Sequence, residues 1–169
     1  MTLFAELRMR PAAPASPDRA RFRGWDASRP ARLVLSAGTL FVLLVGANLA
    51  TPLYPGLSAR LGLGSLGIST AFASYVMSLV AVLLMAGHWS DHIGRRAALT
   101  IAAMLGIAGL AVFATADSLA ALCAGRALHG AAVALATGAS SAALRELLPE
   151  QANWASRFTL LASSGGVAL

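Results

Sequence analysis

The chain has 169 residues, of which 57% are hydrophobic and 12% charged, and its mean hydropathy of +0.71 excludes an ordinary soluble domain of this length. Thirteen arginines and no lysine, against seven acidic residues, give a formal charge of +6. Seven of the arginines lie within residues 1–32, which argues against a nucleic-acid-binding surface. A single cysteine excludes an internal disulfide, and three widely placed histidines do not make a structural zinc site, so we expect no metal.

Residues 1–32 are rich in Ala, Pro and Arg and lack a helical period, so we expect them to form a solvated cytoplasmic tail. Two kinds of targeting segment are alternatives. A transit peptide is poor in acidic residues, whereas this segment holds Glu6, Asp18 and Asp26. A cleaved signal peptide needs a shorter apolar region and an Ala-x-Ala-like site, which residues 47–50 do not provide.

Long apolar runs follow the tail, and a helix needs about 20 predominantly apolar residues to cross about 30 Å of hydrocarbon. The runs predict an all-α polytopic transmembrane helical bundle over residues 33–169. The expected spans are approximately 33–54, 66–87, 97–116, 118–143 and 154–169. The last span is still apolar at Leu169 and has no closing polar flank. We therefore expect these residues to be the first four to five spans of a longer protein whose carboxy-terminal half is missing.

The arginines also predict the orientation of the spans. Eleven of them flank the spans on the side of the tail, only Arg60 lies on the other side, and Arg126 lies inside the fourth span. Cytoplasmic loops carry an excess of Lys and Arg, so the amino terminus is expected in the cytoplasm. We expect an integral membrane protein, in a bacterial inner membrane.

The loop between the second and third expected spans reads Gly-His-Trp-Ser-Asp-His-Ile-Gly-Arg-Arg over residues 87–96. It resembles the Gly-x-x-x-Asp-(Arg/Lys)-x-Gly-(Arg/Lys)-(Arg/Lys) signature of the major facilitator superfamily, which lies at this same junction. The matching residues are Gly87, Asp91, Gly94, Arg95 and Arg96, whereas His92 replaces a basic residue of the pattern.

The resemblance implies that this loop is a conformational latch between alternating states. Asp91 and Arg95 can pair across one helical turn, and Glu146 at the end of the fourth span is the expected partner of Arg95 or Arg96. An alternative interpretation of the loop does not depend on the family resemblance. In it, the two arginines are positive-inside anchors and Gly94 ends a helix.

Arg126 lies eight residues beyond Ser118, about 12 Å into the fourth span. An arginine near the middle of a span costs about 2.5–3.5 kcal/mol on insertion scales, which favours a function for it over the alternative of a side chain that reaches the external headgroups. The segment from Gly125 to Gly130 resembles the fourth-helix motif of the same superfamily, with His129 in place of a Gln-like residue. The resemblance implies that Arg126 takes part in proton-coupled transport, with His129 as a second titrating group or a hydrogen-bond partner.

Small and polar residues complete the expected site. Gly130, Ala134 and Gly138 recur every four residues and predict close packing of another helix. Asn48 lies near the outer end of the first span, in a stretch similar to efflux-type members of the superfamily, and is a candidate cavity residue. The second span carries a polar stripe that is more typical of interhelical contacts than of a binding site, at Ser74, Tyr75 and Ser78.

No phosphate-binding lysine motif, nucleophile elbow or paired-carboxylate site is present in the sequence, so we do not expect an enzyme or a bound cofactor. The resemblance implies a secondary active transporter that exports a small solute by alternating access, with a proton gradient as its energy source. The partners would be the lipid bilayer, the solute, protons and the missing carboxy-terminal half. The alternative is a membrane accessory or interaction subunit that does not transport, or an inactive fragment.

Overall fold

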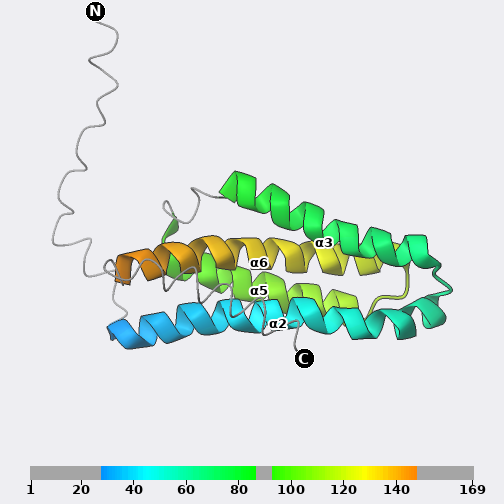
Figure 1. Cartoon of the computed structure of the whole chain (residues 1–169), viewed down its shortest axis with the longest axis horizontal. Coiled ribbons are helices and arrows are strands. Elements are labelled where there is room, and N and C mark those ends of the chain that lie inside the picture. The colour runs from blue at the N-terminus through cyan, green and yellow to red at the C-terminus, as the bar shows by residue number, and fades with distance from the viewer. Residues whose placement is uncertain (1–27, 87–92, 148–169) are drawn as a thin grey trace, which may run out of the picture.

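The computed structural model describes residues 28–86 and 93–147, and this part of the chain consists of helices joined by short turns. The helices lie side by side along one direction (Figure 1). All four are long and apolar enough to cross a membrane, which confirms the predicted all-α transmembrane bundle. They are α2 (Arg29–Leu61), α3 (Ser65–Ala86), α5 (Arg95–Ala114) and α6 (Leu119–Leu147).

Helix α2 departs most from its expected span, because it continues to Leu61 instead of ending near residue 54. Pro52 and Pro55 lie inside it. Each proline removes one backbone donor, and the neighbouring turns keep the helix continuous. The helix ends where Gly62 adopts the left-handed conformation (φ 63°, ψ 29°) and its N–H donates to the Ser58 carbonyl oxygen. The other three helices lie close to their expected spans, and the expected fifth span lies outside the described residues.

Helix α6 is the centre of the described bundle, since it packs against α2, α3 and α5. Half of its most apolar stretch is buried, whereas only 6% of the corresponding stretch of α3 is buried. Helix α3 packs almost entirely against α6 and scarcely touches α2. Figure 1 accordingly shows α3 on the outside of the bundle, with one end turned away from the other helices.

Two apolar clusters fill the bundle, one toward each end. The first is built from α2, α5 and α6 and includes Leu40, Leu43 and Val133. The second, which includes Tyr54, Phe113 and Leu122, lies nearer the turn between α5 and α6. Along α6 the residues between the two clusters include two buried polar side chains, which form a polar layer inside an otherwise apolar core. These side chains are Arg126 and His129.

Serine hydroxyls join the helices across this core. Ser74 Oγ and Ser78 Oγ of α3 donate to the carbonyl oxygens of Cys123 and Ala127 on α6, at 3.1 and 2.7 Å. The interhelical role expected for the polar stripe of the second span is therefore found. On the other side of α6, the Ser140 hydroxyl donates to a carbonyl oxygen of α2 at 3.0 Å.

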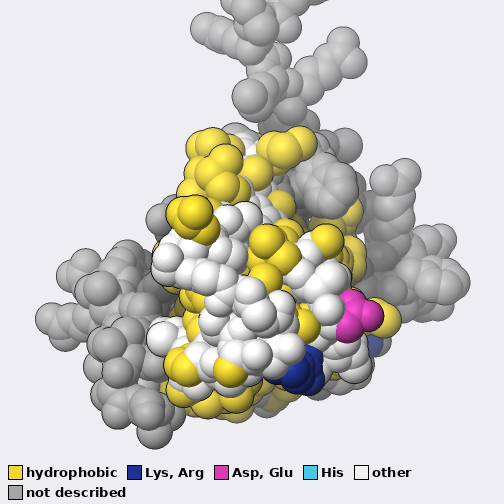
Figure 2. Space-filling view, turned by 90° about the vertical axis from the view of Figure 1, so that its right-hand side faces the viewer, with side chains coloured by type: hydrophobic (Ala, Val, Ile, Leu, Met, Phe, Trp, Pro, Cys, Tyr) yellow, Lys and Arg dark blue, Asp and Glu magenta, His cyan; other side chains and the backbone are white. Residues whose placement is uncertain are grey.

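The outside of the bundle is largely apolar. Leu66, Leu84 and Met85 of α3 are each about four-fifths exposed, and large hydrophobic side chains of α2 and α5 are also exposed. At the end where α2 leads into α3, the surface shows few charged groups among hydrophobic ones (Figure 2). In a soluble domain, charged side chains lie on the surface and apolar side chains lie inside. This bundle has a buried cation and an apolar surface, and that distribution suits a surrounding of hydrocarbon.

Candidate functional site

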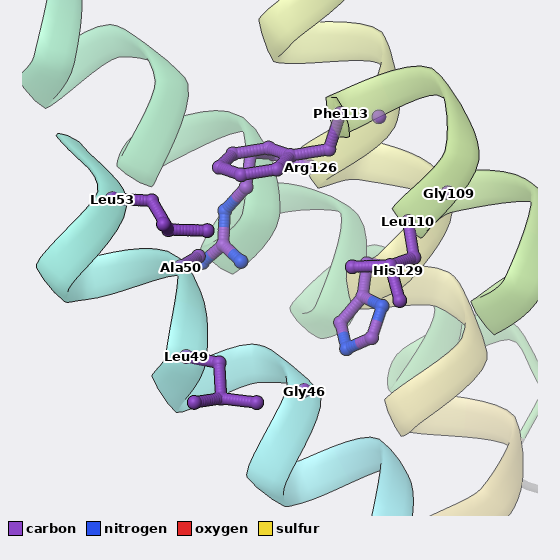
Figure 3. Close-up of a pocket in the computed structure, with 10 residues that line it drawn as sticks. Gly46, Leu49, Ala50, Leu53, Gly109, Leu110, Phe113, Arg126 and His129 are labelled. Atoms are coloured by element: carbon purple, nitrogen blue, oxygen red, sulfur yellow. The ribbon is translucent and has the colours of Figure 1, made fainter. Parts of the chain in front are cut away.

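A small cavity of about 30 Å³ lies between α2, α5 and α6, within the polar layer (Figure 3). Among the described residues that line it, Arg126 and His129 are the ones with polar side chains, and both point from α6 toward α2. The rest of the lining is glycine or apolar: Gly46, Leu49, Ala50, Leu53, Gly109, Leu110, Phe113 and Gly125.

The Arg126 guanidinium lies between two tyrosines of different helices. Its carbon is 5.9 Å from the ring centroid of Tyr54 on α2 and 4.4 Å from that of Tyr75 on α3. A cation over aromatic faces is stabilised by about 0.5–2 kcal/mol, with the larger value in desolvated sites. Its Nη1 donates to the Ala47 carbonyl oxygen at 3.5 Å, which is a long hydrogen bond. Since Arg126 is only 4% exposed, it is held inside the bundle and does not extend along the surface.

Two polar atoms of this cluster have no hydrogen-bond partner in the described structure. They are Nε of Arg126 and the hydroxyl of Tyr54, and both are buried. The Tyr54 ring is fixed by an edge-on contact with Phe113, at 6.2 Å between centroids and 73° between planes. A buried polar group without a partner costs about 1–3 kcal/mol. The cluster therefore contains a buried donor, Nε–H of Arg126, that no acceptor among the described residues satisfies.

His129 is 5% exposed and joins α6 to α2. Its Nε2 lies 3.0 Å from the Leu43 carbonyl oxygen, so the nitrogen at this position carries the hydrogen. Gly46 makes room for the ring, because a Cβ at that position would lie 3.1 Å from Cε1 of His129. The imidazole thus lies against the backbone of α2 one turn away from the Arg126 cluster.

Asn48 is half-buried on α2, and its amide donates to the Leu44 carbonyl oxygen of the same helix at 2.9 Å. It does not line the cavity. The structure therefore places Asn48 beside the cluster on α2 and leaves its side chain bonded within its own helix.

The expected latch is described only in part. Gly87 and Asp91 lie outside the described residues, and the side chain of Glu146 is not described, although its backbone lies in the last turns of α6. Gly94 precedes α5 with φ 87° and ψ 147°, and Arg95 and Arg96 are the first two residues of that helix. The pairing of these charges stays a prediction.

The expected packing residues differ in their surroundings. Gly130 lies against α3 so closely that a Cβ there would contact the Tyr75 carbonyl oxygen. Ala134 is buried. At Gly138, in contrast, an added Cβ would have no neighbouring atom within 4 Å. Sequence reasoning missed the part that Gly125 plays in close helix packing and the aromatic partners of Arg126. The sequence offered one indication of the role of Gly125, which is its position directly before Arg126.

These helices define a class of protein: an α-helical membrane protein with a buried cation in a cavity between helices long and apolar enough to span a bilayer. The family model of the Major Facilitator Superfamily matches residues 36–169, and the chain therefore belongs to this superfamily of membrane transporters. No curated protein and no solved structure matches the chain. Members of the superfamily are transporters and not enzymes, which agrees with the expectation from the sequence.

Proposed function

We propose that this chain is part of a secondary active transporter that exports a small solute by proton-coupled alternating access. The observation that carries the proposal is Arg126, a buried cation in a cavity formed by three helices. Ionisable residues within membrane spans are costly and mark substrate, ion or proton pathways. In secondary transporters, such sites lie near the bilayer midplane, where one group of helices rocks against another.

Arg126 and His129 suit different parts of this function. An arginine keeps its positive charge, so Arg126 acts as a fixed charge that attracts whichever anionic group enters the cavity. An imidazole changes its charge between about pH 5 and 8. Because both side chains line one cavity, a proton on His129 raises the positive potential around Arg126 and so links protonation to the binding of an anionic group.

The loop before α5 is proposed as the latch that holds one state. The proposal rests on Asp91, Arg95 and Arg96 of the family pattern, with Glu146 of α6 as a partner. Gly94 supports it, since its positive φ directs the chain sharply into α5. We further propose a bacterial inner membrane as the location and a cytoplasmic amino terminus, on the basis of the arginine-rich tail.

The experiment compares Arg126→Ala with wild type in the full-length protein, reconstituted into liposomes with an imposed pH gradient. A panel of fluorescent solutes reports solute flux, and a trapped pH dye reports proton flux. We expect Arg126→Ala to abolish the linked fluxes while the protein still inserts. Arg60→Ala is the control: this arginine lies at one end of the bundle, where Nη2 donates to the Ala116 carbonyl oxygen at 2.5 Å, and proton-linked flux should persist. Unchanged proton-linked flux in Arg126→Ala would contradict the assignment.

A further inference from the structure

The cavity carries a positive charge that no acidic side chain of the described residues neutralises. Asp117, the one acidic residue whose side chain is described, is exposed in the turn between α5 and α6. No ion pair involves Arg126 within the described ranges. A charge removed from water is tolerated when it is paired and hydrogen-bonded, so a buried arginine of this kind calls for an anion.

The two unpartnered atoms define what kind of anion fits. Nε–H of Arg126 is a donor, and the hydroxyl of Tyr54 can donate as well. Tyr54 does not itself line the cavity, but its ring packs against the guanidinium of Arg126, which does, with the ring centroid 5.9 Å from the guanidinium carbon. A carboxylate accepts several hydrogen bonds and pairs with a planar guanidinium, so it satisfies both the charge and the two donors.

The size and the remaining lining define the rest of the ligand. The cavity of about 30 Å³ holds about two water-sized groups, which is the size of a carboxylate head. Apart from Arg126 and His129, the larger side chains that line the cavity are apolar: Leu49, Leu53, Leu110 and Phe113. A ligand with a charged head and an apolar body therefore fits better than a sugar or another solute that is polar throughout.

We propose that Arg126 and Tyr54 bind the carboxylate of the transported solute, so that the substrates are small organic acids with an apolar body. This inference rests on the proposed transport function and names its substrate class. The same carboxylate chemistry could come from an acidic side chain of the protein itself, and the experiment separates the two sources.

The test measures equilibrium binding of radiolabelled benzoate to the full-length protein in lipid nanodiscs, without any gradient. Benzamide, which has the same shape and no charge, is the competitor for comparison. We expect benzoate to bind about tenfold or more tightly than benzamide, because only the carboxylate pairs with the guanidinium. A protein whose Arg126 is neutralised by its own acidic side chain would bind neither, and this result would overturn the proposal.

Variants test which residues do the binding. Arg126→Gln should weaken benzoate binding about tenfold or more and remove the preference over benzamide. Arg126→Lys should keep the preference with lower affinity, since it keeps the charge and loses the planar fork. Arg60→Gln removes a charge far from the cavity and should bind as wild type does. Benzoate binding that survives Arg126→Gln unchanged would also overturn the proposal.

Tyr54→Phe covers the case in which Arg126→Gln fails to fold. It removes a hydroxyl that has no partner in the described structure, so folding should not suffer, and benzoate binding should weaken about threefold to tenfold. Unchanged affinity in this variant counts against the proposed site. The binding assay needs no transport, so loss of proton-linked flux with intact benzoate binding would refute the transport function alone, and the reverse pattern would refute only the substrate class.

Discussion

Gly109 of α5 and Gly125 of α6 face each other backbone to backbone, and a Cβ built on either residue would lie 2.9 Å from the carbonyl oxygen of the other. Small residues let membrane helices approach this closely, which increases van der Waals contact between them. Gly125 directly precedes Arg126, and both glycines line the cavity. The separation of α5 and α6 at this contact therefore fixes how far the guanidinium and the imidazole project toward α2.

Gly125→Ala should destabilise the protein, because the new methyl group would meet backbone atoms of Phe113 at 2.7 and 3.0 Å, and backbone cannot rotate away. Overpacking of this kind costs about 1–3 kcal/mol. Gly138→Ala is the matched control on the same helix, since nothing lies within 4 Å of that position and alanine favours helix. Thermal unfolding of the full-length protein in detergent should show a lower Tm for Gly125→Ala and an unchanged or higher Tm for Gly138→Ala. Equal Tm values would contradict the close contact.

Ser74→Ala and Ser78→Ala should loosen the attachment of α3 to α6. The Ser78 hydroxyl donates across the two helices, and the Ser74 hydroxyl shares its hydrogen between Cys123 of α6 and Ala71 of its own helix. Interhelical hydrogen bonds in membranes contribute about 0.6 kcal/mol on average and up to about 1.7 kcal/mol. The free energy of unfolding should therefore fall by about 1–3 kcal/mol in the double variant. Thr70→Ala on the same helix is the control, since the Thr70 hydroxyl bonds to Leu66 within α3. A double variant as stable as Thr70→Ala would show that α3 is held by other contacts.

His129→Gln should separate the structural role of the imidazole from its charge. The amide of glutamine can donate to the Leu43 carbonyl oxygen as Nε2 does, but it does not take up a proton. We expect a Tm near that of wild type and a transport rate that depends less on pH, because the glutamine side chain does not titrate. His88→Gln, in the loop between the second and third spans, is the matched substitution and should keep the wild-type pH profile. An unaltered profile in His129→Gln would exclude His129 from proton coupling.

Gly94→Ala should destabilise the start of α5, since φ 87° with ψ 147° is a conformation that essentially only glycine adopts. Strain of this kind costs about 1–3 kcal/mol. Gly62→Asn is the comparison, because its left-handed φ of 63° with ψ 29° is one that asparagine tolerates. Circular dichroism during heating should show a larger loss of stability for Gly94→Ala than for Gly62→Asn. The opposite order would mean that the chain enters α5 by a different path.

The helices could be predicted from the sequence, and the contacts between them could not. Charge-free runs of the right length fix a transmembrane helix, and the decapeptide ending at Arg96 together with Arg126 was enough to recognise the superfamily, which the family model confirms. Contacts depend on how each helix is rotated about its axis. These helices are apolar on every face, so no amphipathic pattern reveals that rotation. Spacing alone consequently selected Gly138, which faces open space, and missed Gly125, which faces backbone.

The partners of Arg126 illustrate the same limit. Tyr54 and Tyr75 belong to different helices and have no sequence relation to the arginine, so only the packed bundle brings the three together. The length of α2 shows a different limit. The first span was expected to end near residue 54, whereas α2 continues through Pro52 and Pro55 to Leu61, because a helix tolerates the loss of single donors when the turns on either side remain bonded.

The unequal lengths of α2 and α3 have a consequence for the membrane around them. At about 1.5 Å per residue, the 33 residues of α2 measure about 50 Å and the 22 residues of α3 about 33 Å, against about 30 Å of hydrocarbon. Helix α3 matches the bilayer when upright, whereas α2 must tilt or project into the headgroups. A change in acyl-chain length therefore alters the tilt of α2 more than that of α3. Because α2 forms one wall of the cavity, a change in its tilt changes the shape of the cavity. The thickness of the bilayer therefore influences the site.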